Sequence, residues 1–331
     1  MPFPVSDDCP KDKNGLLLCD EPELRSRILP LFRFDPRHPE DRVIGQGTTF
    51  RIDPWGTCLT AFHVIEDILI HNEAASGKAI LRDGVRLCAL ELEGIGFGTF
   101  RLPEDAWRPL SGLSAPCAVE SKPFQYPEIV NSFELAALTI EHSTKKPAAT
   151  KYLSIDLRRW KPTIGERVLA LGFADLDKGE PMESDDRAIS QYLFGSFGNI
   201  IEIDKPDPGN KRAWPSFRVD ASWPGGMSGG PVFNETGNVI GMVSTGFSHL
   251  EGDATATATY FSAWSVPSQY LPSIDPDNPG HIFGFAVLDE KENVVRFWPR
   301  RDQLVSWARE HGYKPPMLVG FNPDTGEWCS R

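Results

Sequence analysis

From residue 43 onward, the chain alternates short apolar or β-branched runs with turn residues. The first two runs are GQGTTFRI at 45–52 and TCLTAFHVI at 57–65, and Asp53-Pro54-Trp55-Gly56 separates them. Runs of this composition predict strands, and a turn rich in Pro and Gly between them predicts a β-hairpin. The pattern of the chain therefore opens with paired strands.

A helical pattern follows His63. Ile65, Ile68 and Leu69 lie at helical spacing, which predicts a short helix that ends near the Ser76-Gly77 pair.

Further β-rich runs follow along the chain. Strands are predicted at 79–100 and 133–142, and the Pro-rich stretch 103–128 between them is predicted to be a long irregular surface insertion. Five later runs have the same β-rich texture: 167–174, 191–203, 216–222, 231–247 and 256–266. Many short strands with few long amphipathic helices predict an all-β sandwich or barrel.

The two ends of the chain differ from this β-rich middle. The N-terminal part carries prolines, mixed charge and one helix-like patch, and we interpret it as an extension or strap. The C-terminal part is rich in Pro and Asp, then strand-like at 283–298 and helical at 301–312. We expect four segments: an N-terminal extension at 1–42, a first β-barrel at 43–148, a second at 149–275, and a C-terminal extension at 276–331.

Composition and charge narrow the class of protein. The chain has 331 residues, 40% of them hydrophobic, which is enough for two packed units of ordinary size. Its net charge of −12 argues against a surface that neutralises phosphates or anionic lipids, so neither nucleic acid nor a membrane is an expected partner. No basic-then-apolar leader and no run of about 18 apolar residues is visible, so we expect a cytoplasmic location.

The cysteines suggest no metal site. Six of them are scattered without a CxxC pair or a Cys/His cluster at zinc spacing: Cys9, Cys19, Cys58, Cys88, Cys117 and Cys329. Without an export signal, we expect buried free thiols rather than disulfides. No cofactor is expected.

The strongest chemical signal is GGMSGGPVF at 225–233, with Ser228 at its centre. A serine hydroxyl is a weak nucleophile until a base removes its proton, and a developing oxyanion needs backbone N–H donors beside it. Glycine at 226 allows a tight conformation in which its amide and that of Ser228 point at one oxygen. A simple Gly-rich turn between strands is the alternative interpretation.

His63 lies in LTAFHV, at the end of an apolar strand and ahead of the predicted helix. A lone histidine in apolar surroundings is more often a core residue than a catalyst. When the Ser228 motif is considered as well, a general base becomes the better interpretation of His63. The other histidines of the chain lie in polar or turn-like contexts.

These motifs resemble those of the trypsin-like serine peptidases, especially the bacterial branch related to the high-temperature-requirement peptidases. LTAFHV is similar to that family's histidine motif, GMSGGPVF to its nucleophile motif, and GNVIGMVSTGF to the strand that follows, and the resemblance covers roughly 43–272. It implies two six-stranded antiparallel β-barrels and a serine endopeptidase. His63 would be the general base, Ser228 the nucleophile, and the amides of Gly226 and Ser228 the oxyanion hole.

The resemblance also implies where substrate would bind. Ser244, Thr245 and Gly246 correspond to the edge strand that pairs with an extended substrate backbone, so the expected substrate is a flexible segment of a protein. Ser222 corresponds to the base of the primary pocket, which implies a preference for a neutral or small apolar side chain.

The acid of the expected triad departs from the family pattern. The family has aspartate ahead of a small apolar run, and here Glu134 precedes Leu135-Ala136-Ala137-Leu138. A glutamate can hold the imidazole in the required tautomer if its longer stem is accommodated, and some viral relatives of the fold use one. The alternative is an exposed strand residue, but the apolar neighbours would make an unpaired charge costly there.

Two other functions remain open. A catalytically inactive peptidase fold kept as a binding module would account for Glu134 and the long insertion. Gly226 to Gly230 also fits the G-x-S-x-G elbow of an α/β-hydrolase-type esterase, which needs a strand before it and a helix after it. No peptide-binding domain is recognisable after residue 275, so we expect the substrate to be a dedicated partner protein; the oligomeric state stays open.

Overall fold

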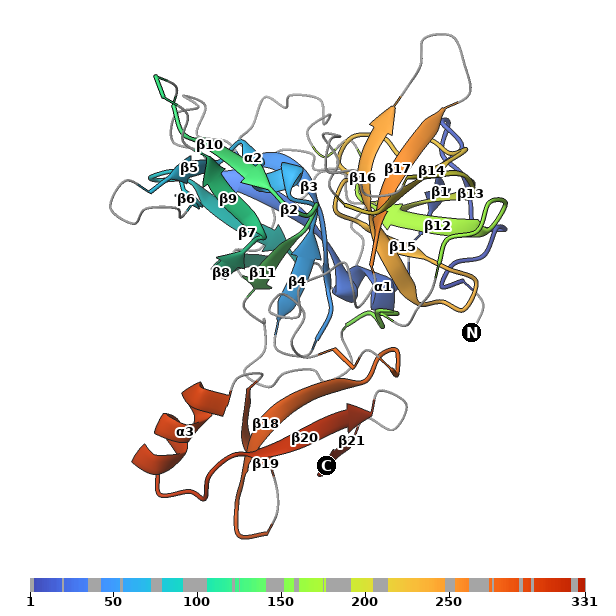
Figure 1. The fold of residues 1–331 in the computed structure, drawn as a ribbon. Helices are drawn as coiled ribbons and strands as arrows, with labels where there is room; N and C mark the ends of the chain where they lie inside the picture. Colours follow the sequence, from blue (N-terminus) through green and yellow to red (C-terminus); the bar gives the residue numbers. More distant parts are fainter. Residues whose placement is uncertain are drawn as a thin grey trace.

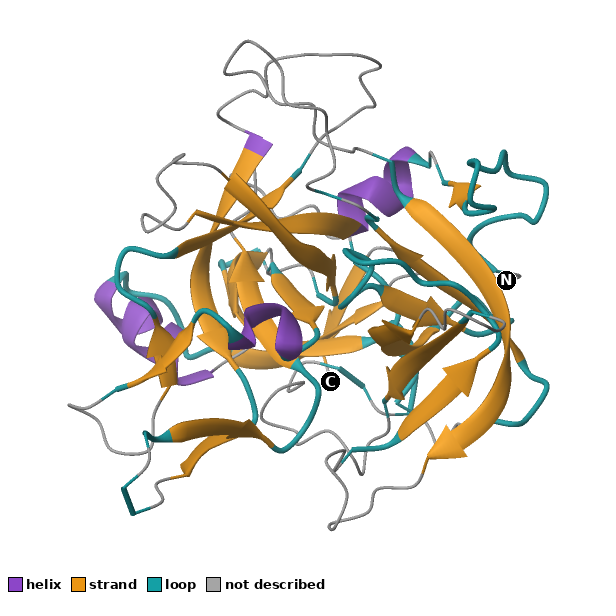
Figure 2. Ribbon diagram, turned by 90° about the horizontal axis from the view of Figure 1, so that it is seen from above, coloured by secondary structure: helices purple, strands orange, loops and turns teal. Residues whose placement is uncertain are grey.

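The computed structural model consists of two β-barrels side by side and a smaller C-terminal unit (Figure 1). It describes residues 3–19, 21–34, 43–53, 56–72, 79–91, 106–120, 123–124, 126–140, 152–157, 161–174, 176, 192–204, 214–247, 254–261, 274–275, 277–291, 294–298, 301–322 and 327–330. Strands dominate these residues and the helices are short, as Figure 2 shows. The all-β prediction is confirmed.

The first barrel is closed by six antiparallel strands in the order β11-β4-β3-β2-β7-β8. Its strands are β2 (Ile28–Phe34), β3 (Val43–Arg51), β4 (Thr57–Thr60), β7 (Arg86–Leu90), β8 (Trp107–Ser114) and β11 (Ala136–Ile140). The predicted hairpin is β3 and β4, which pair Phe50 with Leu59. Pro54 and Trp55 of the predicted turn lie outside the described residues.

The first barrel begins earlier than the expected boundary at residue 43. A short helix, α1 (Pro22–Arg27), leads into β2, which pairs with both β3 and β7. Ile28, Leu29 and Leu31 are fully buried there. A continuous apolar run fits a strand covered on both faces as well as it fits a helix, so the local pattern did not distinguish the two.

The stretch 103–128 is not irregular, contrary to the prediction. It contains β8, a strand of the barrel, and β9 (Cys117–Glu120), which forms a hairpin with β10 (Glu128–Asn131). The residues of β8 are half-buried or exposed and include Pro109, so their composition is that of a loop. Pairing with β7 and β11 makes the segment a strand.

The helix after His63 is shorter than predicted. It is a single turn, α2 (His63–Glu66), and Leu69–His71 form β5, which pairs with β6 (Ala79–Leu81). The predicted end near Ser76-Gly77 lies outside the described residues.

The second barrel closes in the same way, because β14 pairs with both β17 and β13. Its strands are β12 (Arg167–Gly172), β13 (Phe194–Asp204), β14 (Ser216–Val219), β15 (Pro231–Phe233), β16 (Val239–Phe247) and β17 (Thr255–Tyr260). The short strand β1 (Leu17–Leu18) adds to β13 from outside. The expected pair of six-stranded antiparallel barrels is therefore present.

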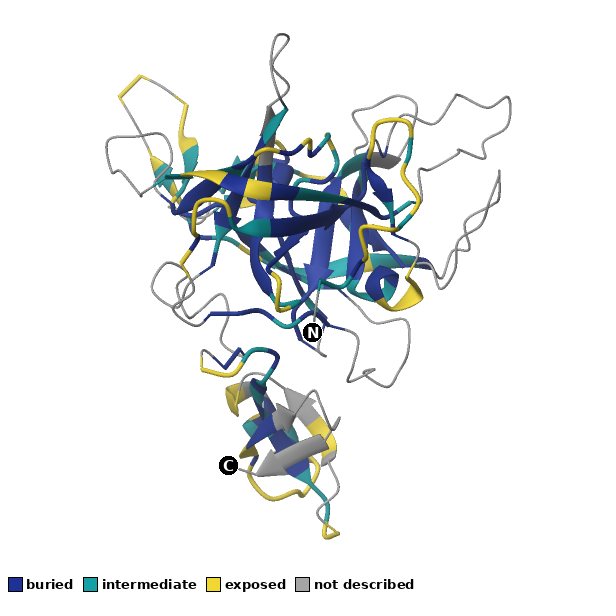
Figure 3. Ribbon diagram, turned by 90° about the vertical axis from the view of Figure 1, so that its right-hand side faces the viewer, coloured by how far each residue is buried: buried dark blue, intermediate teal, exposed yellow. Residues whose placement is uncertain are grey.

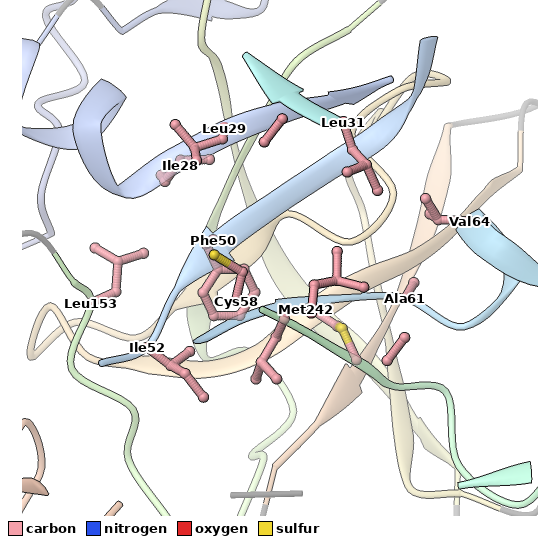
Figure 4. Packing of buried hydrophobic residues seen from close by; sticks show 14 of the residues in the cluster. Ile28, Leu29, Leu31, Phe50, Ile52, Cys58, Ala61, Val64, Leu153 and Met242 are labelled. Carbon is pink, nitrogen blue, oxygen red and sulfur yellow. The ribbon is translucent and has the colours of Figure 1, made fainter. Parts of the chain in front are cut away.

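One hydrophobic core runs from the first barrel into the contact between the barrels. It joins Phe50 and Leu59 of the first barrel to Leu169 and Met242 of the second. Figure 4 shows Met242 among side chains of β2, β3 and β4. The interior of the second barrel has its own core, and the barrel strands are the most buried part of the molecule in Figure 3. This shared core holds the two barrels in one orientation.

The C-terminal unit contains the predicted strand-like and helical segments. Its sheet has the order β19-β18-β20-β21, and α3 (Arg301–Glu310) packs on β18 through Val287, Leu304 and Ala308. The strands are β18 (Ile282–Leu288), β19 (Val294–Trp298), β20 (Met317–Asn322) and β21 (Glu327–Ser330). The Tyr152 hydroxyl donates to the Gly280 carbonyl at 2.8 Å, which ties this unit to the chain that enters the second barrel.

Five described cysteines are free thiols. Cys19 and Cys58 are buried, and burial raises the pKa of each to about 12, while Cys9, Cys88 and Cys117 are half-buried. Among the described residues, no helix has the length and apolar character needed to cross a membrane.

Candidate active site

The structure brings His63 and Glu134 into direct contact. The His63 ring Nδ1 lies 2.6 Å from Glu134 Oε1, and the His63 backbone N–H donates to the same oxygen at 3.0 Å. A carboxylate at this distance favours the tautomer with hydrogen on Nδ1, which leaves Nε2 free to accept a proton. The ring is thus held as a general base requires.

The strands of the first barrel account for this contact. Strands β4 and β11 run antiparallel with Thr60 opposite Ala136. His63 follows the end of β4 and Glu134 precedes the start of β11, so both lie at the same end of the strand pair. Glu134 lies in the bend before the strand rather than within it.

Glu134 is a buried acid with several donors. Its exposed fraction is 4%, and Phe133 and Leu135 on either side are also buried, which contradicts the alternative of an exposed strand residue. Asn131, at the end of β10, donates from Nδ2 to the second carboxylate oxygen at 3.2 Å. Sequence reasoning missed Asn131, because a single asparagine ahead of a turn has no distinguishing pattern.

A second carboxylate, Glu66, lies on α2 close to this pair. Burial raises the pKa of Glu66, and the negative charge of Glu134 adds to the rise while His63 opposes it. The region around the imidazole is therefore rich in negative charge.

Ser228 lies in the loop between β14 and β15. Gly226 and Gly229 on either side of it have φ of +95° and +82°, values that glycine adopts without strain. Met227 between them is fully buried in the core of the second barrel. The buried Met227 anchors the loop while Ser228 stays half-buried at its surface.

Two glycines show how closely this loop approaches the His63 segment. A Cβ on Gly47 would lie 2.8 Å from the Ser228 carbonyl oxygen and 3.0 Å from Val64 Cγ2. A Cβ on Gly229 would lie 2.2 Å from Thr60 Oγ1. The nucleophile loop thus packs against the chain just before the histidine, and Gly47 lies between the loop and Val64, although these segments are far apart in sequence.

The Ser228 hydroxyl donates to the Ser244 carbonyl at 3.4 Å. Among the described residues, no hydrogen bond joins it to the His63 ring. Unliganded catalytic hydrogen bonds are often long or misaligned and tighten on substrate binding. The loop that carries Ser228 packs against Thr60 and Ala61 through Gly229, and the hydroxyl and the imidazole are not bonded to each other in this structure.

The predicted substrate residues fall in two places. Ser244, Thr245 and Gly246 lie on β16, where Thr245 and Gly246 pair with β17. Pairing with β15 ends at Met242, and the Val243 backbone then binds Gly229 and Gly230 of the nucleophile loop. Beyond that point, Thr245 and Gly246 have no strand partner on this side within the described chain. Ser222 is exposed, whereas its neighbour Trp223 is 3% exposed.

The nucleophile-elbow interpretation is wrong. The loop is followed by β15 and then by the hairpin to β16, not by a helix. The described residues also lack the parallel α/β arrangement that the elbow requires.

Comparison with known proteins bears on these residues. Residues 47–242 match the model of the trypsin-like peptidase domain, a range that contains His63, Glu134 and Ser228. No curated protein gives a significant sequence match.

Three solved structures are similar to the chain. An inactive serine-to-alanine mutant of Rv3671c from M. tuberculosis has 14% identity and a TM-score of 0.40, covering 80% of this chain and 96% of its own. A serine-to-alanine variant of the HtrA-type protease AlgW with a decapeptide has 16% identity and a TM-score of 0.40, covering 71% of this chain and 60% of its own. The same protease with a tripeptide has 16% identity and a TM-score of 0.42, covering 71% and 56%. This chain therefore matches less than two thirds of the AlgW length.

The substitution Gly229→Ala tests the contact between the loop and the first barrel. We expect it to lower the free energy of unfolding by roughly 3 kcal/mol or more, since it combines left-handed strain with a clash against backbone. Thermal unfolding measures this loss. Gly225→Ala is the matched control, because a Cβ there would meet no atom within 4 Å. Equal melting temperatures for the two variants would contradict the close approach.

Proposed function

This chain belongs to the family of trypsin-like peptidase domains, and we propose that it is a serine endopeptidase that acts through His63, Glu134 and Ser228. The observation that carries the proposal is the 2.6 Å contact between His63 Nδ1 and the buried Glu134 carboxylate. It leaves the other ring nitrogen as a base, and Ser228 lies on the loop packed against the same segment.

The proposed reaction has two halves. In the first, Ser228 Oγ attacks the carbonyl carbon of the substrate peptide bond while His63 Nε2 takes the hydroxyl proton. The amides of Gly226 and Ser228 stabilise the oxyanion, and Glu134 stabilises the imidazolium. Nε2 then returns the proton to the departing amine, which leaves an acyl ester on Ser228. In the second half, His63 activates a water that hydrolyses the ester.

Glutamate in place of aspartate is compatible with this role. The carboxylate receives both the ring N–H and the backbone N–H of His63 on one oxygen and Asn131 on the other. Three donors offset the cost of burying a charge, and they hold the longer side chain in one orientation.

The proposed substrate is an extended segment of a dedicated partner protein. Thr245 and Gly246 of β16 pair with β17 on one side, and substrate backbone would pair with their other side. Proteins are cleaved most readily where the chain is flexible enough to adopt such an extended form.

An inactive binding module is the second candidate. The hydrogen bond from the Ser228 hydroxyl to the Ser244 carbonyl favours it, because a nucleophile needs its proton directed at the base.

Active-site labelling separates these two candidates. We expect a fluorophosphonate probe to label the folded wild-type protein on Ser228, because only an activated serine with an oxyanion hole reacts rapidly. Mass spectrometry of the labelled peptide locates the site. Ser228→Ala is the control and should remain unlabelled. Absence of label on the wild type would support the binding module.

The substitution Glu134→Gln tests the acid. It keeps the shape of the side chain but no longer favours hydrogen on Nδ1, and the expected loss in kcat is roughly 10³- to 10⁴-fold. Glu66→Gln is the matched control, since it removes a neighbouring carboxylate that lies close to the imidazole without being assigned to the triad. A Glu134→Gln variant with wild-type kcat on an activated peptide ester would overturn the assignment.

Trapping tests the dedicated partner. Immobilised Ser228→Ala protein should retain one or a few proteins from a lysate of the source cells, and the wild type should release the same proteins as fragments. Mass spectrometry identifies both sets. A broad mixture of unfolded proteins on the column would point instead to general quality control.

A further inference from the structure

Thr48 lies on β3 of the first barrel and is fully buried. Its backbone N–H donates to the Ser228 carbonyl at 2.8 Å. Its hydroxyl donates to the Gly226 carbonyl at 2.7 Å. One residue of the first barrel thus binds two carbonyls of the nucleophile loop of the second.

The orientation of the Thr48 hydroxyl is determined by its neighbours. The backbone N–H of Phe173, just after β12, donates to Thr48 Oγ1 at 2.9 Å. Because an amide can only donate, the hydroxyl hydrogen is left for the Gly226 carbonyl. On the other side, the Thr60 hydroxyl donates to the Thr48 carbonyl at 2.8 Å. Every polar atom of Thr48 is therefore engaged.

We propose that Thr48 is a positioning residue for the oxyanion hole, an inference that rests on the proposed function. The two residues whose amides would bind the oxyanion, Gly226 and Ser228, are the two whose carbonyls bind Thr48. Peptide groups are planar, so a held carbonyl fixes the peptide plane that follows the residue. Thr48 thereby restrains the peptide group that follows Gly226, which lies between the two donors, and the peptide group that follows Ser228.

The restraint matters most at Gly226. This residue has φ of +95° and no side chain, so its own backbone allows rotation that would turn its N–H away from a common point. Oxyanion stabilisation depends on donors that are already in place when charge develops. The hydrogen bond from the Thr48 hydroxyl restricts the backbone rotation that Gly226 would otherwise allow.

The chain packs closely around the Thr48 hydroxyl. A Cβ on Gly172 would lie 3.1 Å from Thr48 Oγ1 and 2.9 Å from Met227 Cα, so the chain packs tightly around the bond. Replacing the hydroxyl by a methyl group would leave the Gly226 carbonyl and the Phe173 amide without this partner.

The next residue provides a matched control. Thr49 is on the same strand and is also fully buried, and its hydroxyl donates to the Leu59 carbonyl at 2.8 Å. That bond stays within the first barrel. Thr48→Val and Thr49→Val each remove one buried hydroxyl that donates to a carbonyl, and only the first affects the nucleophile loop.

Steady-state kinetics on a peptide ester is the main measurement. We expect Thr48→Val to lower kcat by about 10- to 100-fold, below the loss for removing an oxyanion donor outright. KM should change by no more than about twofold, because the lost alignment acts in the transition state. Thr48→Ser, which keeps the hydroxyl, should restore most of the activity. Thr49→Val should have nearly wild-type kcat.

A peptide boronic acid gives a second measurement that a general loss of stability would not reproduce. Its tetrahedral adduct occupies the oxyanion hole, so its affinity should fall with kcat in Thr48→Val while the affinity for a product peptide stays unchanged. If the valine variants melt well below the wild type, Thr48→Ala and Thr49→Ala replace them in the same comparison.

Three results would overturn the inference. They are equal kcat in Thr48→Val and Thr49→Val, equal losses in Thr48→Val and Thr48→Ser, and a fall in product-peptide affinity as large as that for the boronic acid. A wild-type protein that is neither labelled on Ser228 nor active would overturn the proposed function itself and this inference with it.

Discussion

The hydrogen bond from the Thr48 amide to the Ser228 carbonyl joins the two barrels at the point on which the site depends. His63 and Glu134 belong to the first barrel, and Ser228 and Gly226 to the second, so neither barrel contains the site alone. The barrels approach so closely that a Cβ on Gly47 would clash with the Ser228 carbonyl, and a Cβ on Gly229 would clash with Thr60. A continuous hydrophobic core behind it holds the barrels in the orientation that this contact requires.

The electrostatics of the first barrel follow from burying one carboxylate. A charge with 4% exposure would be costly without partners, and Glu134 meets this cost with the two N–H groups of His63 and the amide of Asn131. The same bonds orient the imidazole. The same hydrogen bonds therefore stabilise the buried acid and orient the ring, and they show how the fold accommodates a glutamate where the family pattern has an aspartate.

Local sequence was informative where the chain pairs with its own near neighbours. The hairpin of β3 and β4 is predictable from the sequence because its two strands and its turn are contiguous. The burial of Met227 in the core of the second barrel has no such local signal. The strand β2 was assigned to an extension because its apolar run fits a helix as well as a strand, and the register with β3 and β7 that decides between them comes from distant residues. The composition of β8 predicts a loop, because its half-buried and exposed residues include Pro109, and pairing with β7 and β11 makes it a strand.

The sequence by itself identified the residues that carry the proposed chemistry. A serine between glycines, a histidine after an apolar strand and a carboxylate ahead of another strand are recognisable because function requires those residue types at those places in the chain. Only the tertiary structure decided which atoms meet: that the ring and the backbone N–H of His63 share one oxygen of Glu134, and that Thr48 binds the carbonyls of Gly226 and Ser228. It also decided that Trp223 rather than Ser222 is the buried side chain beside the loop. The contacts of Thr48 join residues far apart in the chain, and no periodicity or motif along the sequence indicates them.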